Sequence, residues 1–237
     1  MIEALFEQSE VGEMSAAIER LKTEADSLDQ TCIHKGSMFV ITEKDGQKQI
    51  RRVSWAAPAE PELKKWGQDK RLTGVAKDLL GSDTANQLIN QVHFKYPHDG
   101  VRYPFHQDCK HRGIGTDAWT DINGKGSYVQ SLTAIDEATI DNGPMYFIPY
   151  SCKDGNLELE LGYNDEADTD LSVHDLAEPV PILMKPGDVA FFGPYTIHGS
   201  FPNTSESPRR VFINGYAYPG ANTRNYPGEG SGELITL

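Results

Sequence analysis

One sequence feature limits the possible folds more than any other: a set of potential metal ligands that lie far apart in the chain. His106 and Asp108 are separated by one residue, and His198 follows much later. In an extended segment, residues i and i+2 project from the same face, so His106 and Asp108 can approach one ion from a single strand end. Two imidazoles and one carboxylate form the non-haem Fe(II) facial triad, which leaves coordination positions open. If all three bind one metal, the fold has to return His198 to the strand that carries His106.

Two adjacent arginines, Arg209 and Arg210, lie a short distance after His198. A guanidinium group is the usual partner of a carboxylate that is held by two parallel hydrogen bonds. Adjacent residues of a strand point to opposite faces, so we expect one arginine to point inward and the other toward solvent or an ion pair. Two histidines, an aspartate and a following arginine suit a site that binds iron and 2-oxoglutarate together.

The spacing of apolar residues predicts helices in the first third of the chain and short strands after it. A helix over 10–29 has an apolar face made of Val11, Met14, Ile18, Leu21 and Leu28. A second helix over 70–81 directs Leu72, Val75, Ala76, Leu79 and Leu80 inward and stops at Gly81. Strands are predicted at 91–96, 128–135, 145–148, 180–184, 189–192, 197–201 and 210–218, with Gly and Pro between them. This order favours a mainly β fold with flanking helices, a double-stranded β-helix of the jelly-roll or cupin-like type.

The chain has 237 residues, which favours one domain over 1–237 with a sizeable core. Within it we expect 1–90 to form a helical lead-in and support, including a short third helical turn at 84–90. The β-barrel core is expected to span 91–220.

The composition excludes several classes of function. The formal net charge is −13, whereas a nucleic-acid footprint needs a positive surface, and the same charge disfavours an anionic membrane. No apolar run approaches the length of a membrane span, and no signal-like N-terminus is present. The three widely spaced cysteines, Cys32, Cys109 and Cys152, predict neither a disulfide framework nor a zinc site. We therefore expect a cytoplasmic protein that binds neither nucleic acid nor a membrane.

Two segments stand out by charge: 35–77 is rich in Lys and Arg, and 153–178 is rich in Asp and Glu. The simpler interpretation of both is a solvated loop or helix face. The functional alternative is a lid or a substrate-facing loop, and it applies most directly to 153–178 because insertions between barrel strands often shape the entrance of a site.

Five short segments together resemble one known family. They are Tyr-Pro-Phe-His-Gln-Asp at 103–108, Asp-Asn-Gly-Pro-Met-Tyr-Phe-Ile-Pro at 141–149, Lys-Pro-Gly-Asp at 185–188, Ile-His-Gly-Ser at 197–200 and Pro-Arg-Arg at 208–210. In this order and spacing the chain resembles the phytanoyl-CoA dioxygenase (PhyH) family over roughly 70–230. The resemblance implies a double-stranded β-helix, with Fe(II), 2-oxoglutarate and O2 as cofactor and cosubstrates. It also implies hydroxylation of a small molecule, with release of succinate and CO2.

The resemblance assigns roles to individual residues. His106, Asp108 and His198 would hold the iron, and the presence of Asp108 favours hydroxylation over halogenation. Arg209 has the family's spacing from the second histidine, so Arg209 would pair with the far carboxylate of 2-oxoglutarate. Ser200 would help to hold the same end of the cosubstrate.

Several weaker candidates remain open. Gln91, His93 and Lys95 share one face of a predicted strand, which either lines the pocket or is an exposed polar surface. Gln91 is taken as a candidate for cosubstrate binding, and Thr133 on the next strand as another. The other histidines lack a ligand partner at useful spacing and are not expected to bind the metal; they are His34, His98, His111 and His174.

Two further classes of function compete with the oxygenase hypothesis. A cupin-type protein that holds a metal without turnover would use the same three ligands but would leave the arginine without a purpose. A zinc hydrolase also accepts two histidines and a carboxylate, although no obvious general base accompanies them here. The sequence does not identify the substrate.

Overall fold

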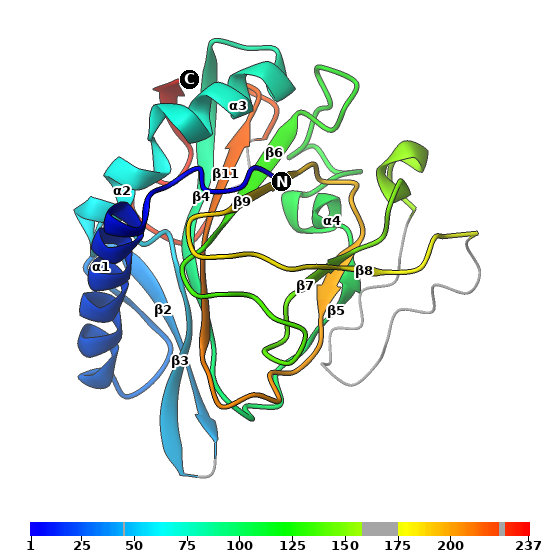
Figure 1. Cartoon of the computed structure of the whole chain (residues 1–237). Helices are drawn as coiled ribbons and strands as arrows, with labels where there is room; N and C mark the ends of the chain where they lie inside the picture. Colours follow the sequence, from blue (N-terminus) through cyan, green and yellow to red (C-terminus); the bar gives the residue numbers. More distant parts are fainter. Residues whose placement is uncertain (45, 158–174, 223–225) are drawn as a thin grey trace.

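Two antiparallel sheets face each other, and helices cover the outer face of the larger one (Figure 1). The computed structural model describes residues 1–44, 46–157, 175–222 and 226–237, and the structural statements below refer to these. The large sheet has the strand order β1-β2-β3-β4-β11-β6-β9, with β12 paired to β4, and the small sheet has the order β5-β10-β7-β8. This is the expected double-stranded β-helix.

The strands of the large sheet are β1 (Cys32–His34), β2 (Ser37–Lys44), β3 (Gln47–Ser54), β4 (Thr84–Lys95), β6 (Tyr128–Ala134), β9 (Val189–Phe192), β11 (Arg209–Ala217) and β12 (Glu233–Thr236). Those of the small sheet are β5 (Tyr103–His106), β7 (Met145–Phe147), β8 (Val180–Ile182) and β10 (His198–Ser200). The helices are α1 (Gln8–Asp26), α2 (Pro61–Gly67), α3 (Lys70–Leu80) and α4 (Asp108–Arg112), with a 3-10 turn, η1 (Ser151–Asp154).

The two long helices form for reasons that are visible in the sequence. In α1 the predicted apolar stripe of Val11, Met14, Ile18 and Leu21 is buried. The helix α3 begins where the Asp69 carboxylate accepts a hydrogen bond from the backbone N–H of Arg71. It ends as predicted at Gly81, whose φ of +69° is a left-handed conformation that glycine adopts without strain. One detail of the α3 prediction is wrong, because Leu79 is exposed.

Alternation along the strands separates two apolar layers. Val92, Phe94 and Phe212 of β4 and β11 pack beneath α1 against Met14 and Ile18. Residues of the opposite parity face the small sheet, where the rings of Phe147 in β7 and Phe192 in β9 lie 4.9 Å apart. Each fully buried apolar side chain of this size stabilises the fold by about 1.5–3 kcal/mol. The large sheet therefore has one face for the helices and one for the interior between the sheets.

The N-terminal segment of the chain is attached to the large sheet at the start of β9. Ile2 and Val189 form an antiparallel bridge, and the Ala4 N–H donates to the Asp188 carboxylate at 2.8 Å. The Phe6 N–H donates to the carbonyl of Gly187. Residues 2–6 therefore run beside β9 on the side that β6 does not occupy.

The expected helical lead-in over 1–90 is wrong in part. The strands β1, β2 and β3 lie within it and extend the large sheet, and 84–90 belongs to β4 instead of a helical turn. The far ends of β2 and β3 form an exposed hairpin with charged side chains, which hides the apolar alternation of a strand. The residues from Gln87 to Asn90 are all buried, so this part of β4 shows no alternation either.

The two charged segments have different outcomes. In 35–77 many basic side chains form ion pairs with acids, for example Lys35 with Glu24 and Arg71 with Glu10, which agrees with the simpler interpretation. The acidic segment 153–178 falls largely on 158–174, which lie outside the described residues, so its expected role as a lid stays a prediction. Among the described residues, no helix combines the length and apolar character needed to cross a bilayer.

A buried ion pair secures the turn that leads from β4 to β5. Arg51 Nη1 donates to Asp99 Oδ2 at 2.9 Å, and the side chains are 9% and 0% exposed. The two carboxylate oxygens also accept the backbone N–H groups of Tyr96 and Val101, both at 2.8 Å. This turn fixes the start of the strand that ends at His106.

We expect Asp99→Ala to lower the free energy of unfolding by about 3–5 kcal/mol, because it leaves a buried guanidinium and two backbone N–H groups without their partner. Urea denaturation followed by circular dichroism measures this change. Glu206→Ala, which removes the exposed partner of His98 in the same region, is the control and should have little effect. Equal stability of the Asp99 variant and the parent would contradict a structural role for the pair.

Candidate metal centre

Strand pairing in the small sheet brings the two histidines together. His198 of β10 is the register partner of His106 of β5, and their ring centroids lie 4.3 Å apart. His106 Nδ1 lies 2.7 Å from the carbonyl oxygen of Pro104, and His198 Nδ1 lies 2.9 Å from that of Thr196. An Nδ1–H that donates to a carbonyl fixes the tautomer and leaves Nε2 with a lone pair. Both rings are thus prepared to act as ligands through Nε2.

Asp108 reaches the same place by a different route from the one expected. It does not continue the strand, because β5 ends at His106 and Asp108 is the first residue of α4. Gln107 holds the turn between them: its Nε2 donates to the carbonyls of Gly155 at 2.8 Å and Tyr195 at 2.6 Å. Asp108 Oδ1 lies 3.8 Å from His106 Nε2. A strand end and a helix start therefore present the imidazole and the carboxylate side by side.

The charges of this cluster favour the forms that bind a cation. Burial by itself would raise the pKa of Asp108, but Arg112 and the neighbouring histidines lower it, and the pKa lies well below its ordinary value. Burial also lowers the pKa of His198 to about 4, with a further contribution from His106. At neutral pH the centre therefore has an ionised carboxylate and a neutral His198.

A fourth group that the sequence analysis set aside lies beside the centre. His111 follows Asp108 by three residues on α4, and ligand atoms of His106, Asp108 and His111 all lie within 4.8 Å of one another. The rings of His106 and His111 meet edge to face with centroids 5.4 Å apart. The helical spacing of Asp108 and His111 is the signal that could have found it, but the motif around His106 predicts a strand that includes Asp108.

On the inner face of the large sheet, two basic side chains lie next to the histidines. Arg209 of β11 pairs in register with Lys95 of β4, and Lys95 Nζ donates to Ser200 Oγ at 2.8 Å. Arg209 is 5% exposed, and its Nε has no hydrogen-bond partner among the described residues. Burial lowers the pKa of Lys95 to about 6, and the charge of Arg209 lowers it further. A buried guanidinium beside a hydroxyl and an amine makes a site for an anion.

His93 and Tyr103 connect this anion site with the metal ligands. His93 lies two residues before Lys95 on the same face of β4, and its ring lies 5.7 Å from that of Tyr103, the register partner of Ser200. Burial lowers the pKa of His93 to about 3, and Arg52 and Arg209 lower it further, whereas Asp108 acts in the opposite direction. His93 therefore lies within the electrostatic reach of both ends of the site.

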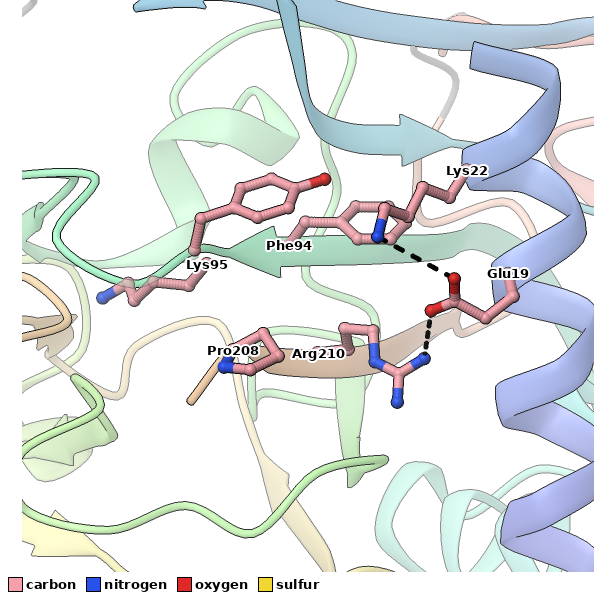
Figure 2. Close-up of a pocket in the computed structure, with 7 residues that line it drawn as sticks. Glu19, Lys22, Phe94, Lys95, Pro208 and Arg210 are labelled. Carbon is pink, nitrogen blue, oxygen red and sulfur yellow. Dashed lines mark hydrogen bonds and ion pairs between the residues drawn. The ribbon is translucent and has the colours of Figure 1, made fainter. Parts of the chain in front are cut away.

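The alternation of adjacent arginines holds in the structure. Arg209 points to the inner face, whereas Arg210 forms a bidentate ion pair with Asp136 and a further pair with Glu19 of α1, each with a contact of 2.7 Å. Arg210 and Glu19 line a cavity of about 120 Å³ on the helix side of the sheet (Figure 2). Figure 2 also shows the amine of Lys95 pointing away from these two side chains. This cavity is on the opposite face from Arg209.

The two weaker candidates have different outcomes. Gln91 pairs with Ile213 and lies on the inner face with His93 and Lys95, so a contact with a ligand remains a prediction. Thr133 pairs with Phe212 and Val189, which belong to the apolar layer beneath α1. The expectation that Thr133 contacts the cosubstrate is therefore wrong, because its strand register turns it away from the site.

Comparison with known proteins places the chain in a family. The family model for "Phytanoyl-CoA dioxygenase (PhyH)" matches residues 1–211. A methylphosphonate hydroxylase of Gimesia maris is 31% identical over 146 residues, which are 62% of this chain and 50% of that protein. A probable phytanoyl-CoA dioxygenase of Caenorhabditis elegans is 29% identical over 188 residues, which are 73% of this chain and 56% of that protein. The chain thus spans about half the length of these relatives.

A solved structure gives the same fold. EctD from S. alaskensis, determined with 2-oxoglutarate and 5-hydroxyectoine, superposes with a TM-score of 0.71 over 91% of this chain and 70% of that one. Sequence identity is 21%, so this similarity shows the fold alone. The match of the family model over most of the chain shows that the protein belongs to the phytanoyl-CoA dioxygenase (PhyH) family.

Proposed function

We propose that this chain is an Fe(II)- and 2-oxoglutarate-dependent dioxygenase that hydroxylates an unactivated C–H bond of a small molecule, using O2 and releasing succinate and CO2. The position of Arg209 is the observation that supports this most strongly. Its guanidinium is buried on the inner face, and no ion pair with a described residue neutralises it. Its register partner Lys95 donates a hydrogen bond to Ser200, which lies two residues after His198 on β10.

The residues at the centre fit a divalent metal ion. His106 and His198 each keep Nε2 available because Nδ1 faces a backbone carbonyl. Asp108 is ionised, and His198 is neutral at physiological pH, so no proton has to leave these two groups when a metal binds. In the family resemblance these are the three iron ligands, and His111 is the additional group whose role has to be separated from theirs.

The inner face fits the far end of a dicarboxylate cosubstrate. A buried guanidinium without a partner costs several kcal/mol, on the order of the penalty for an uncompensated buried charge. A bound carboxylate would offset that cost, with Ser200 and Lys95 as further hydrogen-bonding groups. His93 lies between the two ends and carries a buried Nε2 without a partner among the described residues.

When they are bound, iron and 2-oxoglutarate supply the oxidising chemistry, whereas the chain supplies geometry and exclusion of water. His106, Asp108 and His198 hold the metal from one side, and Arg209 with Ser200 orients the cosubstrate. The rings of Phe192 and Phe147 lie 4.9 Å and 6.2 Å from that of His198 and keep solvent away from this side.

The alternative is a cupin-type protein that binds a metal without turnover. It is less well supported because it gives the buried Arg209 no anionic partner. The names of the relatives span phosphonate and phytanoyl-CoA substrates, so the substrate stays unspecified. Succinate release in a screen of small metabolites with Fe(II), 2-oxoglutarate and O2 tests the proposal. Metal binding with no 2-oxoglutarate binding and no succinate would favour the alternative.

The first prediction separates the metal ligands from their neighbour. Asp108→Ala and His198→Ala should each abolish or strongly weaken Fe(II) binding, because each removes one of three protein donors. His111→Ala, an exposed residue, is the matched control and should leave most of the affinity intact. Anaerobic titration with Fe(II), or calorimetry with Mn(II), measures this. If His111→Ala lost binding and His198→Ala kept it, the assignment of the third ligand would be wrong.

The second prediction concerns the two arginines. Arg209→Ala should weaken 2-oxoglutarate binding by about 2–5 kcal/mol, the scale for removing one partner of a buried charge pair. Metal binding should persist. Arg210→Ala should change the cosubstrate affinity far less, because its partners are Asp136 and Glu19 on the other face. Anaerobic calorimetry on the metal-loaded variants gives both affinities, and a reversed ranking would contradict the proposed orientation.

The third prediction is a pH dependence. Lys95, with a pKa of about 6, faces Arg209, Asp99 and Arg51, and an anion bound nearby would raise this pKa. Cosubstrate binding would then take up a proton, so affinity should be highest below pH 6 and should fall by up to about tenfold per pH unit above it. Lys95→Met should bind 2-oxoglutarate more weakly than the parent. Its affinity should also change less with pH over roughly pH 6.5 to 8.5, the range in which protonation of Lys95 is coupled to binding. A parent profile as flat as that of the variant would show that Lys95 does not titrate on binding.

A further inference from the structure

The short helix α4 carries a second charged residue that faces the centre. Asp108 is its first residue and Arg112 its last, so the two side chains are one helical turn apart on the same face. Arg112 Nη2 lies 3.6 Å from Asp108 Oδ2, and both side chains are only 8% exposed. A buried arginine beside a metal-binding carboxylate needs an explanation, because its charge repels a metal ion.

The surroundings of Arg112 hold its guanidinium in one place. The ring of Tyr128 lies 4.8 Å and that of Tyr226 lies 5.6 Å from its central carbon, as in cation–π contacts. Arg112 Nη2 also donates to Gln130 Oε1 at 3.2 Å, and that oxygen accepts the Tyr128 hydroxyl at 2.7 Å. A long flexible side chain is thereby fixed on two sides by residues of the large sheet and of the C-terminal region.

The two oxygens of Asp108 consequently have different neighbours. Oδ1 lies 3.8 Å from His106 Nε2, on the side of the imidazoles. Oδ2 lies on the side of Arg112, with which it forms an ion pair, and has no hydrogen-bond partner among the described residues. The arginine therefore distinguishes the two oxygens of one carboxylate.

We propose that Arg112 is a positioning residue that holds Oδ2 of Asp108 and leaves Oδ1 as the one oxygen directed at the metal. This inference rests on the proposed function. A carboxylate that is free to turn can bind a metal through both oxygens and then occupies a position that the cosubstrate needs. The restraint from Arg112 keeps the protein's contribution at three donor atoms, so that a chelating oxoacid and a further ligand have room.

The test compares metal and cosubstrate binding in variants of the full chain. Arg112→Met keeps the length and most of the volume of the side chain without its charge. We expect this variant to bind Fe(II) still, and to bind 2-oxoglutarate about tenfold or more weakly, the scale of losses on removing outer contacts of metal ligands. The visible band of the anaerobic Fe(II)–oxoglutarate chelate should shift in energy. Arg112→Lys should restore part of the 2-oxoglutarate affinity and part of the band position.

Two comparisons separate this role from general stabilisation. Arg210→Met removes another, partly buried arginine on the opposite face of the large sheet, and it should leave the band unchanged. Tyr128→Phe removes only the hydroxyl that supports Gln130 and should give a smaller shift than Arg112→Met, which keeps the test informative if the latter folds poorly. The inference would be overturned if folded Arg112→Met kept the cosubstrate affinity and band position of the parent. If Arg112→Met does not fold, an unchanged band position in Tyr128→Phe would overturn it. Absence of a band in the parent protein would count instead against the proposed function.

Discussion

The pairing of β5 with β10 is the interaction on which the rest of the site depends. It sets His198 opposite His106, and the same pairing sets Ser200 opposite Tyr103, so one short ladder aligns the metal ligands and the anion site. The ladder is supported from outside by Gln107, whose amide bonds to the carbonyls of Gly155 and Tyr195, and by Lys95, whose amine bonds to Ser200. A slip of one residue turns every side chain of a strand to the other face. These contacts therefore keep the two histidines and Ser200 on the face where the candidate site lies.

The large sheet then separates charge by face. Toward the helices, cations are neutralised within the protein, as Arg210 is by Asp136 and Glu19. Toward the interior, Arg209 and Lys95 lie close together, and the response of Lys95 is a lowered pKa. Such an arrangement stores an unfavourable electrostatic energy in the empty protein that an anionic ligand relieves. Part of the free energy of anion binding at this site therefore comes from relief of repulsion that is already present in the folded, unliganded protein.

The sequence predicted the barrel, most of its strands and the candidate ligands His106, Asp108 and His198, because motifs and strand alternation are local properties. The route was wrong for Asp108, which joins the histidines from the start of α4 and not along the strand. Alternation also separated Arg209 from Arg210 correctly. No alternation was available to place Thr133, since a strand buried on both faces, like β6, gives no sign of which side faces the site. The strands β1–β3 were missed because their exposed ends carry charges. His111 and Arg112 were missed for a different reason: the segment after Gln107 turns into a helix, so spacings of three and four residues matter there in place of two.

The bridge between Ile2 and Val189 has a consequence for how the molecule behaves among its own copies. Strand β9 lies at the end of the large sheet, and it is short, apolar and paired to β6 on one side. An open strand edge of this kind is a template for pairing with another chain. The contacts of the Ile2, Ala4 and Phe6 backbones with 187–189 occupy the start of that edge. The segment thus blocks the pairing of another chain at the start of β9, and its loss would expose the backbone groups of Val189 without removing any of the candidate metal ligands.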